Sequence, residues 1–379
     1  MKPKIILQLV VLMFISGFFT SCKKDHKHYC SGDDRIVTTT KVFATGLNNP
    51  RGLAFGPDGY LYVAEGGIGG TNSSTGCDQV IPPIGPYKGD VNGSRISRID
   101  HSGIRTTWVD NLPSTVNAKG FISGVSAAAF IGHTLYALVT GAGCSHGVPS
   151  IPNSVIRINA DRTGTGVANL SDYLKSHPVM NPEPKDFEPD GAWYSMISEE
   201  GDLYAVEANH GELDKISSNG NITRIIDISA TYGHIVPTAV AFRNGNFYVG
   251  NLSTFPATPG ISSVYKITPG GQISVFATGF NMILGIVFDK AGGLYVLENT
   301  TNNPSPTPGT GDIVRVDPSG VKQVITTGLS LPTGMTFGPD GSLYVSNDGF
   351  GPSAVDGGQV LQVSFTCDEM IDNAKTTNE

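Results

Sequence analysis

The chain has 379 residues, a formal net charge of -8, and only 15% charged residues. Removing residues 1–21, which contain two lysines, makes the formal charge about -10, and no basic stripe runs along the rest. This charge argues against a nucleic-acid partner and against attraction to an anionic membrane surface. With 48 Gly and 24 Pro, the composition is typical of a turn-rich all-β protein.

The N-terminus has the pattern of a bacterial lipoprotein signal. A short basic region and an apolar run over residues 5–19 precede Thr20-Ser21-Cys22. This order predicts a signal peptide over 1–21, acylation of Cys22, and an exported protein anchored by lipid to a membrane of the cell envelope, on its periplasmic or cell-surface side. An ordinary secretory signal is the alternative, because Phe19 stands where lipoprotein signals usually have Leu.

A hairpin pattern recurs along the remaining chain. LPTGMTFGPDGSLYVSN (331–347) alternates apolar residues around a Gly-Pro-Asp-Gly turn, and NPRGLAFGPDGYLYVAE (49–65) nearly repeats it. Leu-Tyr or Phe-Tyr pairs mark six copies, beginning at residues 61, 135, 203, 247, 294 and 343. A third strand such as DIVRVD (312–317) and a fourth such as VKQVITTG (321–328) follow. The repeat predicts an all-β, six-bladed β-propeller of four-stranded antiparallel blades.

The ring requires a closing strand. The outer strand of the last blade is missing at the C-terminal end, and TTTKVFATG (38–46) can supply it by pairing with residues 358–365. We therefore expect a lipidated Cys22 and polar tether over 22–37, one propeller over 38–367, and a tail over 368–379.

Cysteine usage fits an oxidising compartment. With Cys22 acylated, Cys30, Cys77, Cys144 and Cys367 remain, and four cysteines allow three pairings. Topology favours Cys77–Cys144, which join insertions of adjacent blades on one face, and Cys30–Cys367, which flank the closing strand pair.

Long loops indicate where a site could lie. In each blade, the start of the first strand, the end of the second and the following loop share one face. Insertions leave from that face, so we expect the site at its channel mouth. The candidate ligand-binding residues there are Arg51, Glu65, Asp190, Glu207, His210, Asn251, Glu298 and Asn347.

Three glutamates recur where second strands end. Glu65, Glu207 and Glu298 could form an acidic ring that holds a cation or a polyol, because Ca²⁺ and Mg²⁺ prefer oxygen ligands. Alternatively, each caps the backbone N–H groups of the adjacent loop. Glu65, Asp190 and Glu207 are the metal-ligand candidates. Imidazoles of His146, His210 and His234 fall on the same face, although no fixed spacing links them. The common hydrolase, zinc-protease and P-loop motifs are absent from the sequence.

At the level of these motifs, over residues 38–365, the chain resembles the ScyD/ScyE family of NHL-like six-bladed propellers. The resemblance implies the fold and leaves the reaction open. We expect a cell-envelope module that binds a small molecule, a glycan or a protein. The alternative is a metal-assisted hydrolase, lactonase or lyase of the gluconolactonase-like class. In that class, ligands precede the motif Gly; here those residues are Arg51, Ser123, Asp190, Thr238, Leu284 and Thr333, of which only Asp190 qualifies.

Overall fold

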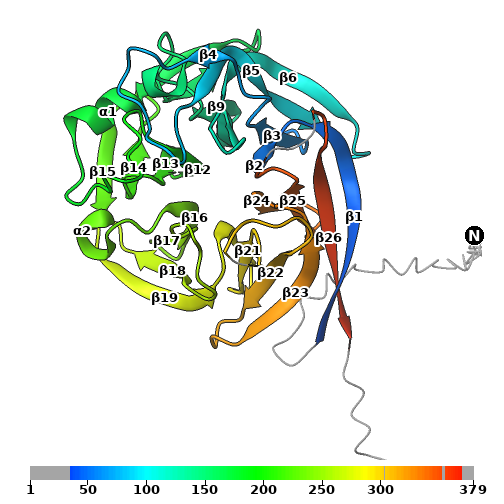
Figure 1. The fold of residues 1–379 in the computed structure, drawn as a ribbon. Helices are drawn as coiled ribbons and strands as arrows, with labels where there is room; N and C mark the ends of the chain where they lie inside the picture. Colours follow the sequence, from blue (N-terminus) through cyan, green and yellow to red (C-terminus); the bar gives the residue numbers. More distant parts are fainter. Residues whose placement is uncertain (1–34, 303, 352–354, 369–379) are drawn as a thin grey trace, which may run out of the picture.

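The computed structural model describes residues 35–302, 304–351 and 355–368. Six antiparallel sheets are arranged as blades around a central axis, so the predicted six-bladed propeller is confirmed (Figure 1). In each blade the first strand lies next to the axis and the fourth lies at the periphery. Among the described residues, no helix is long and apolar enough to cross a membrane.

The first three blades carry the insertions that the unequal spacing of the repeat predicts. Blade 1 contains β2 (Pro50–Phe55), β3 (Leu61–Glu65), β5 (Lys88–Ile99) and β6 (Arg105–Val116), with β4 (Asn72–Ser73) and β7 (Ile122–Ser123) paired at its margins. Blade 2 contains β8 (Val125–Ile131), β9 (Thr134–Val139), β10 (Ser154–Ile158) and β11 (Gly164–Asn169). Blade 3 contains β12 (Trp193–Glu199), β13 (Asp202–Glu207), β14 (Glu212–Ile216) and β15 (Ile222–Asp227).

The other three blades are more regular. Blade 4 contains β16 (Pro237–Arg243), β17 (Asn246–Asn251), β18 (Ser262–Ile267) and β19 (Ile273–Phe280). Blade 5 contains β20 (Ile283–Phe288), β21 (Leu294–Glu298), β22 (Gly311–Val316) and β23 (Lys322–Leu329). Blade 6 contains β24 (Gly334–Phe337), β25 (Leu343–Asn347), β26 (Gly358–Asp368) and, from the N-terminal side, β1 (Arg35–Leu47).

Closure of the ring follows the predicted pairing. β1 runs antiparallel to β26, with Thr38 opposite Phe365, and the two strands extend side by side along the edge of blade 6 (Figure 1). β1 begins at Arg35, three residues before the predicted start at 38, so the last residues assigned to the tether belong to the sheet. The pairing joins the two ends of the chain in one blade, and it explains why the last repeat lacks its own fourth strand.

Short helices occupy the connections. α1 (Leu170–Ser176) follows β11, and the Asn169 side chain caps it by accepting a hydrogen bond of 3.0 Å from the Asp172 N–H. α2 (Ser229–Tyr232) precedes blade 4, and the 3₁₀ helix η1 (Cys144–His146) lies in the insertion of blade 2.

The repeated Gly-Pro-Asp-Gly turn has a structural purpose. In blade 1 the Tyr62 hydroxyl donates a hydrogen bond of 2.9 Å to Asp58 of the turn, and in blade 6 Tyr344 donates one of 3.3 Å to Asp340. Burial, then the neighbouring carboxylate, raises the pKa of both tyrosines to about 12. The turn aspartate therefore positions the tyrosine of the Leu-Tyr pair, which packs between blades.

The motif Gly reflects the crowding of inner strands near the axis. A Cβ on Gly52 would lie 2.9 Å from the Cα of Ala127 in blade 2, and one on Gly334 would lie 2.8 Å from the Arg51 carbonyl oxygen in blade 1. Real Cβ atoms almost never approach so closely, and a backbone atom cannot move aside cheaply. Glycine therefore lets neighbouring blades meet around the channel.

Candidate functional site

The face that carries the long loops is called the long-loop face here, and the opposite face, with the turns 56–59 and 338–341, is the hairpin face. The predicted residues at the ends of second strands lie on the long-loop face. Glu65 accepts a hydrogen bond of 2.6 Å from the Asn48 N–H, and Asn347 accepts one of 2.8 Å from the Ser330 N–H. Each donor lies just before the inner strand of the same blade. At this position of the second strand, the side chain therefore caps a backbone N–H group of the preceding loop in both blades.

The other members of the set also bind backbone groups of neighbouring loops and strands. Glu207 accepts one hydrogen bond of 2.6 Å from Ala192 N–H and others from the N–H groups of His210 and Gly211. Glu298 accepts from the Asn281 N–H. Asn251 accepts a hydrogen bond of 2.7 Å from Ser263 N–H and donates one of 2.9 Å to the Ile235 carbonyl. All five side chains are buried by the loops they cap.

The residue opposite the cap differs between blades. In blade 1, Arg95 pairs with Glu65 at 2.9 Å. In blade 5, Asp312 lies opposite Glu298, and burial, then the Glu298 carboxylate, raises the pKa of Asp312 to about 8. Since both carboxyl groups lie in one buried site, Asp312 keeps its proton at neutral pH.

Blade 3 carries a denser set of buried acids. Glu212 lies opposite Glu207, and Asp214 follows on the same face of β14. Burial, then Asp214, raises the pKa of Glu212, although the Arg224 guanidinium lies 2.5 Å away. Burial also raises the pKa of Asp214. Glu212 and Asp312 each lie opposite a cap residue, and this pairing is a signal that could have identified them from the sequence; Asp214 lies opposite Ala205 and has no such signal.

Asp190 lies before the inner strand of blade 3, because β12 begins at Trp193. Its carboxylate accepts hydrogen bonds of 2.7 Å from Lys175 Nζ and of 2.6 and 2.8 Å from the hydroxyl and N–H of Ser145. Burial alone would raise the pKa of Asp190, but these hydrogen bonds outweigh it and hold the pKa below its ordinary value. The carboxylate therefore joins blade 3 to η1 of blade 2.

The expected register at the channel thus differs from the structure in two blades. A bulge near the start of the inner strand places Tyr194 in blade 3, Thr238 in blade 4 and Leu284 in blade 5 at equivalent positions, and the bulge of blade 2 holds Ser126. Ser123 and Asp190, expected at this position, lie outside the inner strands. The glycines that follow Ser123 and Asp190 come before β8 and β12, so an alignment on the motif Gly places both residues too early in the chain.

The three carboxylates considered as metal ligands do not converge. Glu65 is engaged by Arg95, Asp190 by Lys175 and Ser145, and Glu207 by three backbone N–H groups. Within residues 35–302, 304–351 and 355–368, no group of three or more His, Cys, Asp or Glu side chains is arranged to hold a metal ion. Glu65, Asp190 and Glu207 therefore do not fit a divalent cation as they stand.

The predicted histidines hold a loop in place. The segment 183–191 lies over blade 3, where His210 Nε2 donates a hydrogen bond of 3.0 Å to the Glu188 carbonyl and His234 Nε2 lies 3.1 Å from Asp186. Burial lowers the pKa of His234, but the Asp186 carboxylate outweighs it, so the pKa is raised. His146 Nε2 lies 3.2 Å from the Glu188 carboxylate, which also accepts a hydrogen bond of 2.9 Å from Tyr87. These three imidazoles therefore hold the segment 183–191 in place through Asp186 and Glu188.

The predicted disulfide Cys77–Cys144 is confirmed. The two Cα atoms lie 5.6 Å apart and join the insertions of blades 1 and 2 on the long-loop face. Cys144 begins η1, whose Ser145 and His146 contact Asp190 and Glu188. The disulfide therefore supports the contacts between blades 2 and 3. Cys30 and the side chain of Cys367 lie outside the described residues, so the second pairing stays a prediction, as does acylation of Cys22.

Arg51 lies at the predicted channel mouth and helps to close it. Its guanidinium donates a hydrogen bond of 3.3 Å to the Tyr194 hydroxyl and another to the Ile122 carbonyl. The guanidinium carbon lies 5.7 Å from the Tyr194 ring centroid and 5.6 Å from that of Phe350. Phe350 in turn packs on Phe121 at 4.9 Å. Only 6% of Arg51 is exposed.

Apolar residues pack around Arg51, Tyr194 and Phe350, and the whole cluster is called the plug here. Leu252, Met282, Leu284 and Phe350 are buried in one cluster, and Phe121, Tyr194, Val236 and Leu331 pack against it. The residues come from loops and strands of blades 1, 3, 4, 5 and 6. The plug therefore closes the central channel on the long-loop face, where the sequence predicted an accessible mouth.

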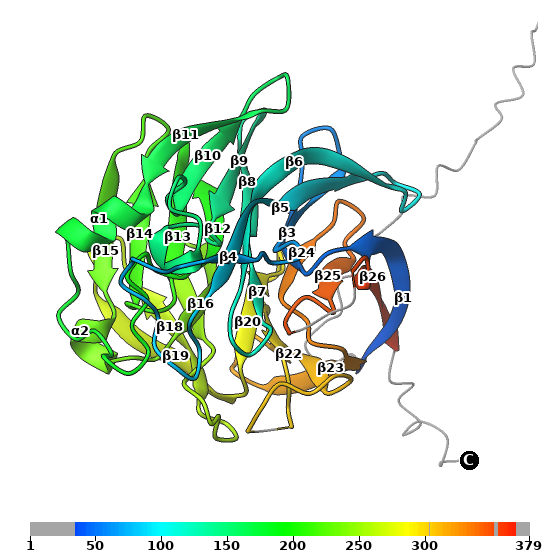
Figure 2. The same ribbon diagram turned by 45° about the horizontal axis from the view of Figure 1, so that its top comes forward.

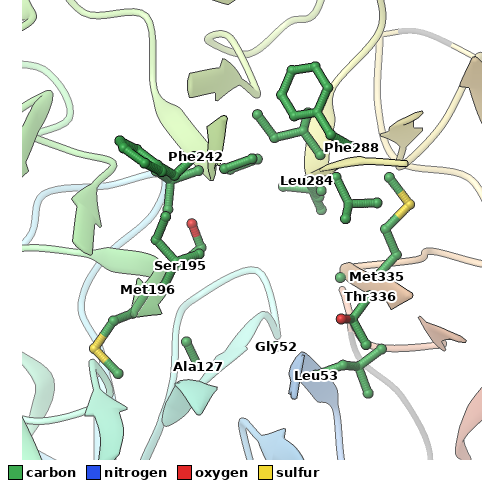
Figure 3. A pocket seen from close by; sticks show the side chains of 18 of the residues that line it. Gly52, Leu53, Ala127, Ser195, Met196, Phe242, Leu284, Phe288, Met335 and Thr336 are labelled. Carbon is green, nitrogen blue, oxygen red and sulfur yellow. The ribbon is translucent and has the colours of Figure 1, made fainter. Parts of the chain in front are cut away.

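Below the plug lies a cavity of about 480 Å³. Inner strands of all six blades line it, from Tyr194 and Thr333 near the plug to Glu199, Arg243 and Lys290 near the hairpin face. Figure 3 shows apolar side chains around it, among them Leu53, Phe242, Leu284, Phe288 and Met335, together with the hydroxyl groups of Ser195 and Thr336. The channel is therefore closed at one end and continues to the hairpin face at the other.

The fold and channel place the chain in the class of six-bladed β-propellers with a central cavity. No protein-family model matches the chain, and no curated protein sequence matches it either. Solved structures share the fold. A gluconolactonase from Xanthomonas campestris is similar with a TM-score of 0.54 and 11% identity, over 89% of this chain and 91% of that one.

Two further structures give the same result. A protein of unknown function from Bacteroides thetaiotaomicron has a TM-score of 0.53 and 13% identity, over 87% of this chain and 77% of that one. The PQQ-bound aldose sugar dehydrogenase from Streptomyces coelicolor has a TM-score of 0.51 and 13% identity, over 87% and 98%. At such identities the likeness shows the fold alone.

Proposed function

We propose that the protein is an exported, lipid-anchored binding module of the ScyD/ScyE type, whose central channel takes one small molecule from the hairpin face. The cavity of about 480 Å³ between the six inner strands carries this proposal. Its volume falls in the range of about 300–1,000 Å³ that small-molecule sites occupy. The plug of Arg51, Tyr194 and Phe350 supports entry from the hairpin end.

The wall of the channel defines the class of ligand. Each inner strand is the edge of its sheet, so its outer N–H and C=O groups face the axis. Leu53, Phe242, Phe288 and Met335 add apolar surface beside these groups. Charged side chains of both signs line the hairpin end, namely Glu199, Asp289, Arg243 and Lys290. The wall suits an uncharged molecule with an apolar body and a few hydrogen-bonding groups.

The alternative is a metal-assisted hydrolase, lactonase or lyase. It is favoured by the names of similar structures, since one is a gluconolactonase and one an aldose sugar dehydrogenase. Against it, Glu65, Asp190 and Glu207 are each engaged by other groups. A Ca²⁺ or Mg²⁺ ion would have to displace an ion pair or several backbone hydrogen bonds. These three residues therefore give the alternative no metal site on the long-loop face, and the channel cavity keeps the binding module as our proposal.

A channel-filling experiment tests the proposal. Ser195→Phe and Thr336→Phe each place a ring in the channel, and Thr223→Phe on the exposed side of β15 is the matched control. We expect saturable binding of the uncharged apolar dye N-phenyl-1-naphthylamine to the wild type and to Thr223→Phe, and its loss in both channel variants. Unchanged binding in the folded channel variants would contradict the proposal. Hydrolysis of gluconolactone that a chelator abolishes would favour the enzyme.

A further inference from the structure

A second cavity lies at the periphery, between blades 1 and 2. Its volume is about 980 Å³. Its lining includes residues 107–113 of β6, the loop 150–152, and residues 161–164 and 166–169 of the β10–β11 hairpin and β11. Figure 2 shows β6 of blade 1 and β10 and β11 of blade 2 along this side of the ring. This blade 1–2 groove is separate from the channel, because the two share no lining residue.

Trp108 is the aromatic side chain of the groove. Its ring is half-buried, and Tyr62 packs edge-on against it with ring centroids 5.7 Å apart. Two guanidinium groups approach the indole: the carbon of Arg98 lies 4.8 Å from the ring centroid and that of Arg162 lies 4.3 Å away. The indole is therefore held in place from within the blade and covered by arginine side chains.

The two arginines differ in how firmly they are held. Arg98 forms a salt bridge of 3.0 Å with Asp58 and lies 3.7 Å from the Tyr60 ring centroid. Arg162 is exposed at the tip of the β10–β11 hairpin, and no salt bridge within the described part of the chain involves it. A cation–π contact at an exposed site is weak, so Arg162 can be displaced from the indole at low cost.

Short polar side chains surround Trp108. Asp110 and Asn111 are exposed and joined by a hydrogen bond of 2.7 Å, while Ser150 and Asp161 lie on the facing wall. Hydroxyl, amide and carboxylate groups together donate and accept hydrogen bonds, which matches the hydroxyl groups of a sugar. The charged side chains lining the groove are Asp110, Asp161 and Arg162, so its net charge is not positive. An anionic ligand is therefore disfavoured.

An extended peptide also fits poorly. β-strand addition needs a regular unpaired edge, but the β5–β6 ladder is irregular between Ser94 and Ser97, and Asn111 of β6 has a φ of 57°. On the facing wall, the register of β10 and β11 shifts between Val155 and Ile156. Bulges on both walls interrupt the row of N–H and C=O groups that a peptide would pair with.

We propose that the blade 1–2 groove binds a neutral oligosaccharide, with one sugar ring stacked on Trp108 in the place of the Arg162 guanidinium. The apolar C–H face of the ring would contact the indole, and its hydroxyl groups would reach Asp110, Asn111 and Asp161. This is a second site, which does not depend on the proposed channel ligand.

The test measures dissociation constants by titration calorimetry on the full chain. The probes are the hexasaccharides of cellulose, amylose, chitin, mannan and xylan at up to millimolar concentration. We expect at least one to bind the wild type, and Trp108→Ala to weaken that binding by about tenfold or more, because an aromatic contact and its apolar area are lost. Trp108→Phe, which keeps a ring, should retain part of the affinity.

Arg162→Ala separates the ligand classes. If a sugar replaces the guanidinium on the indole, removing the arginine leaves the affinity unchanged or increases it. Polygalacturonate serves as the anionic probe, and binding that is restricted to it and lost in Arg162→Ala would overturn the proposal. Failure of all five neutral probes, or binding that survives Trp108→Ala, would do the same. Thr336→Phe in the channel should not change the affinity, which keeps this result independent of the channel ligand.

Discussion

Arg51 of blade 1 and Tyr194 of blade 3 meet across the channel, where the guanidinium donates a hydrogen bond of 3.3 Å to the tyrosine hydroxyl. Burial raises the pKa of Tyr194, although the Arg51 charge acts in the opposite direction. The hydroxyl therefore remains protonated at neutral pH and accepts the hydrogen bond with an oxygen lone pair. The contact joins two blades that are not adjacent, and it forms the end of the cavity.

Arg51→Ala should destabilise the fold. The change removes two cation–π contacts and the hydrogen bond to the Ile122 carbonyl, so we expect the free energy of unfolding in urea to fall by about 2–3 kcal/mol. Tyr194→Phe removes only the hydroxyl and should cost about 1 kcal/mol. An equal loss in both variants would show that the guanidinium does not hold the aromatic residues together.

Glu207→Gln should lower stability whether or not a chelator is present. Its carboxylate accepts three backbone hydrogen bonds, and the amide can accept fewer while its NH₂ group faces the same donors. We expect a loss of about 1–3 kcal/mol in the free energy of unfolding. Glu200→Gln, at an exposed turn, is the control. A chelator that lowers the wild-type melting temperature to that of Glu207→Gln would instead reveal a bound cation.

The fold could be predicted because the same strand-and-turn pattern occurs in each repeat. Six Leu-Tyr or Phe-Tyr pairs occupy equivalent places on second strands, and these strands are buried on both faces between neighbouring blades. A pattern that depends on local alternation and on turn residues can be recognised in the sequence without knowledge of the contacts between blades. Closure could also be predicted, since a missing fourth strand at one end and a spare strand at the other imply each other.

The site was harder to predict from the sequence than the fold, because side-chain contacts between blades determine its shape. The sequence places Arg51 at the channel mouth, but not the rings of Tyr194 and Phe350 that cover it, which come from blades 3 and 6. Asp190 was aligned with the inner strand from its following glycine, whereas the long insertion moves the strand start to Trp193. The recurring glutamates are caps because their partners are backbone N–H groups, which sequence patterns do not show.

Loss of the Cys77–Cys144 disulfide should destabilise the long-loop face. The bond closes a loop across a sequence separation of 67 residues, which in the chain-entropy model contributes about 4 kcal/mol. We expect Cys77→Ala/Cys144→Ala to unfold at lower urea concentration and to show faster amide hydrogen exchange in residues 143–148 and 186–191. Protection that stays unchanged in both segments would contradict the supporting role of the disulfide.

The remaining cysteines test the N-terminal predictions. Cys22→Ser should leave the protein unacylated and release it from the membrane fraction, because Cys22 is the proposed attachment point of the lipid. Retention after alkaline washing would contradict the lipoprotein assignment.

Peptide mapping without reductant should find Cys30 joined to Cys367, and a mixed pair with Cys77 or Cys144 would contradict that pairing.

Asp312→Asn should change how stability depends on pH. Burial, then Glu298, raises the pKa of Asp312 from 3.8 to about 8 in the folded protein. Between these values the folded chain keeps a proton that the unfolded chain has lost, so stability present at low pH is lost as pH rises, and the loss is complete above about pH 8. Asparagine cannot titrate. Relative to the wild type, the variant should therefore be more stable at about pH 9 than at about pH 5.

Asp317→Asn in the same blade is the matched control. Hydrogen bonds from Ser319 and Val321 lower the pKa of Asp317, so its contribution is present above the pKa of the unfolded chain and lost only in acid. Its effect on the melting temperature should be the same at about pH 5 and about pH 9, because the carboxylate is ionised in both states throughout. The test compares the melting temperatures of the wild type and the two variants at both pH values. If Asp312→Asn keeps the wild-type pH slope, Asp312 is not the carboxyl that retains its proton beside Glu298.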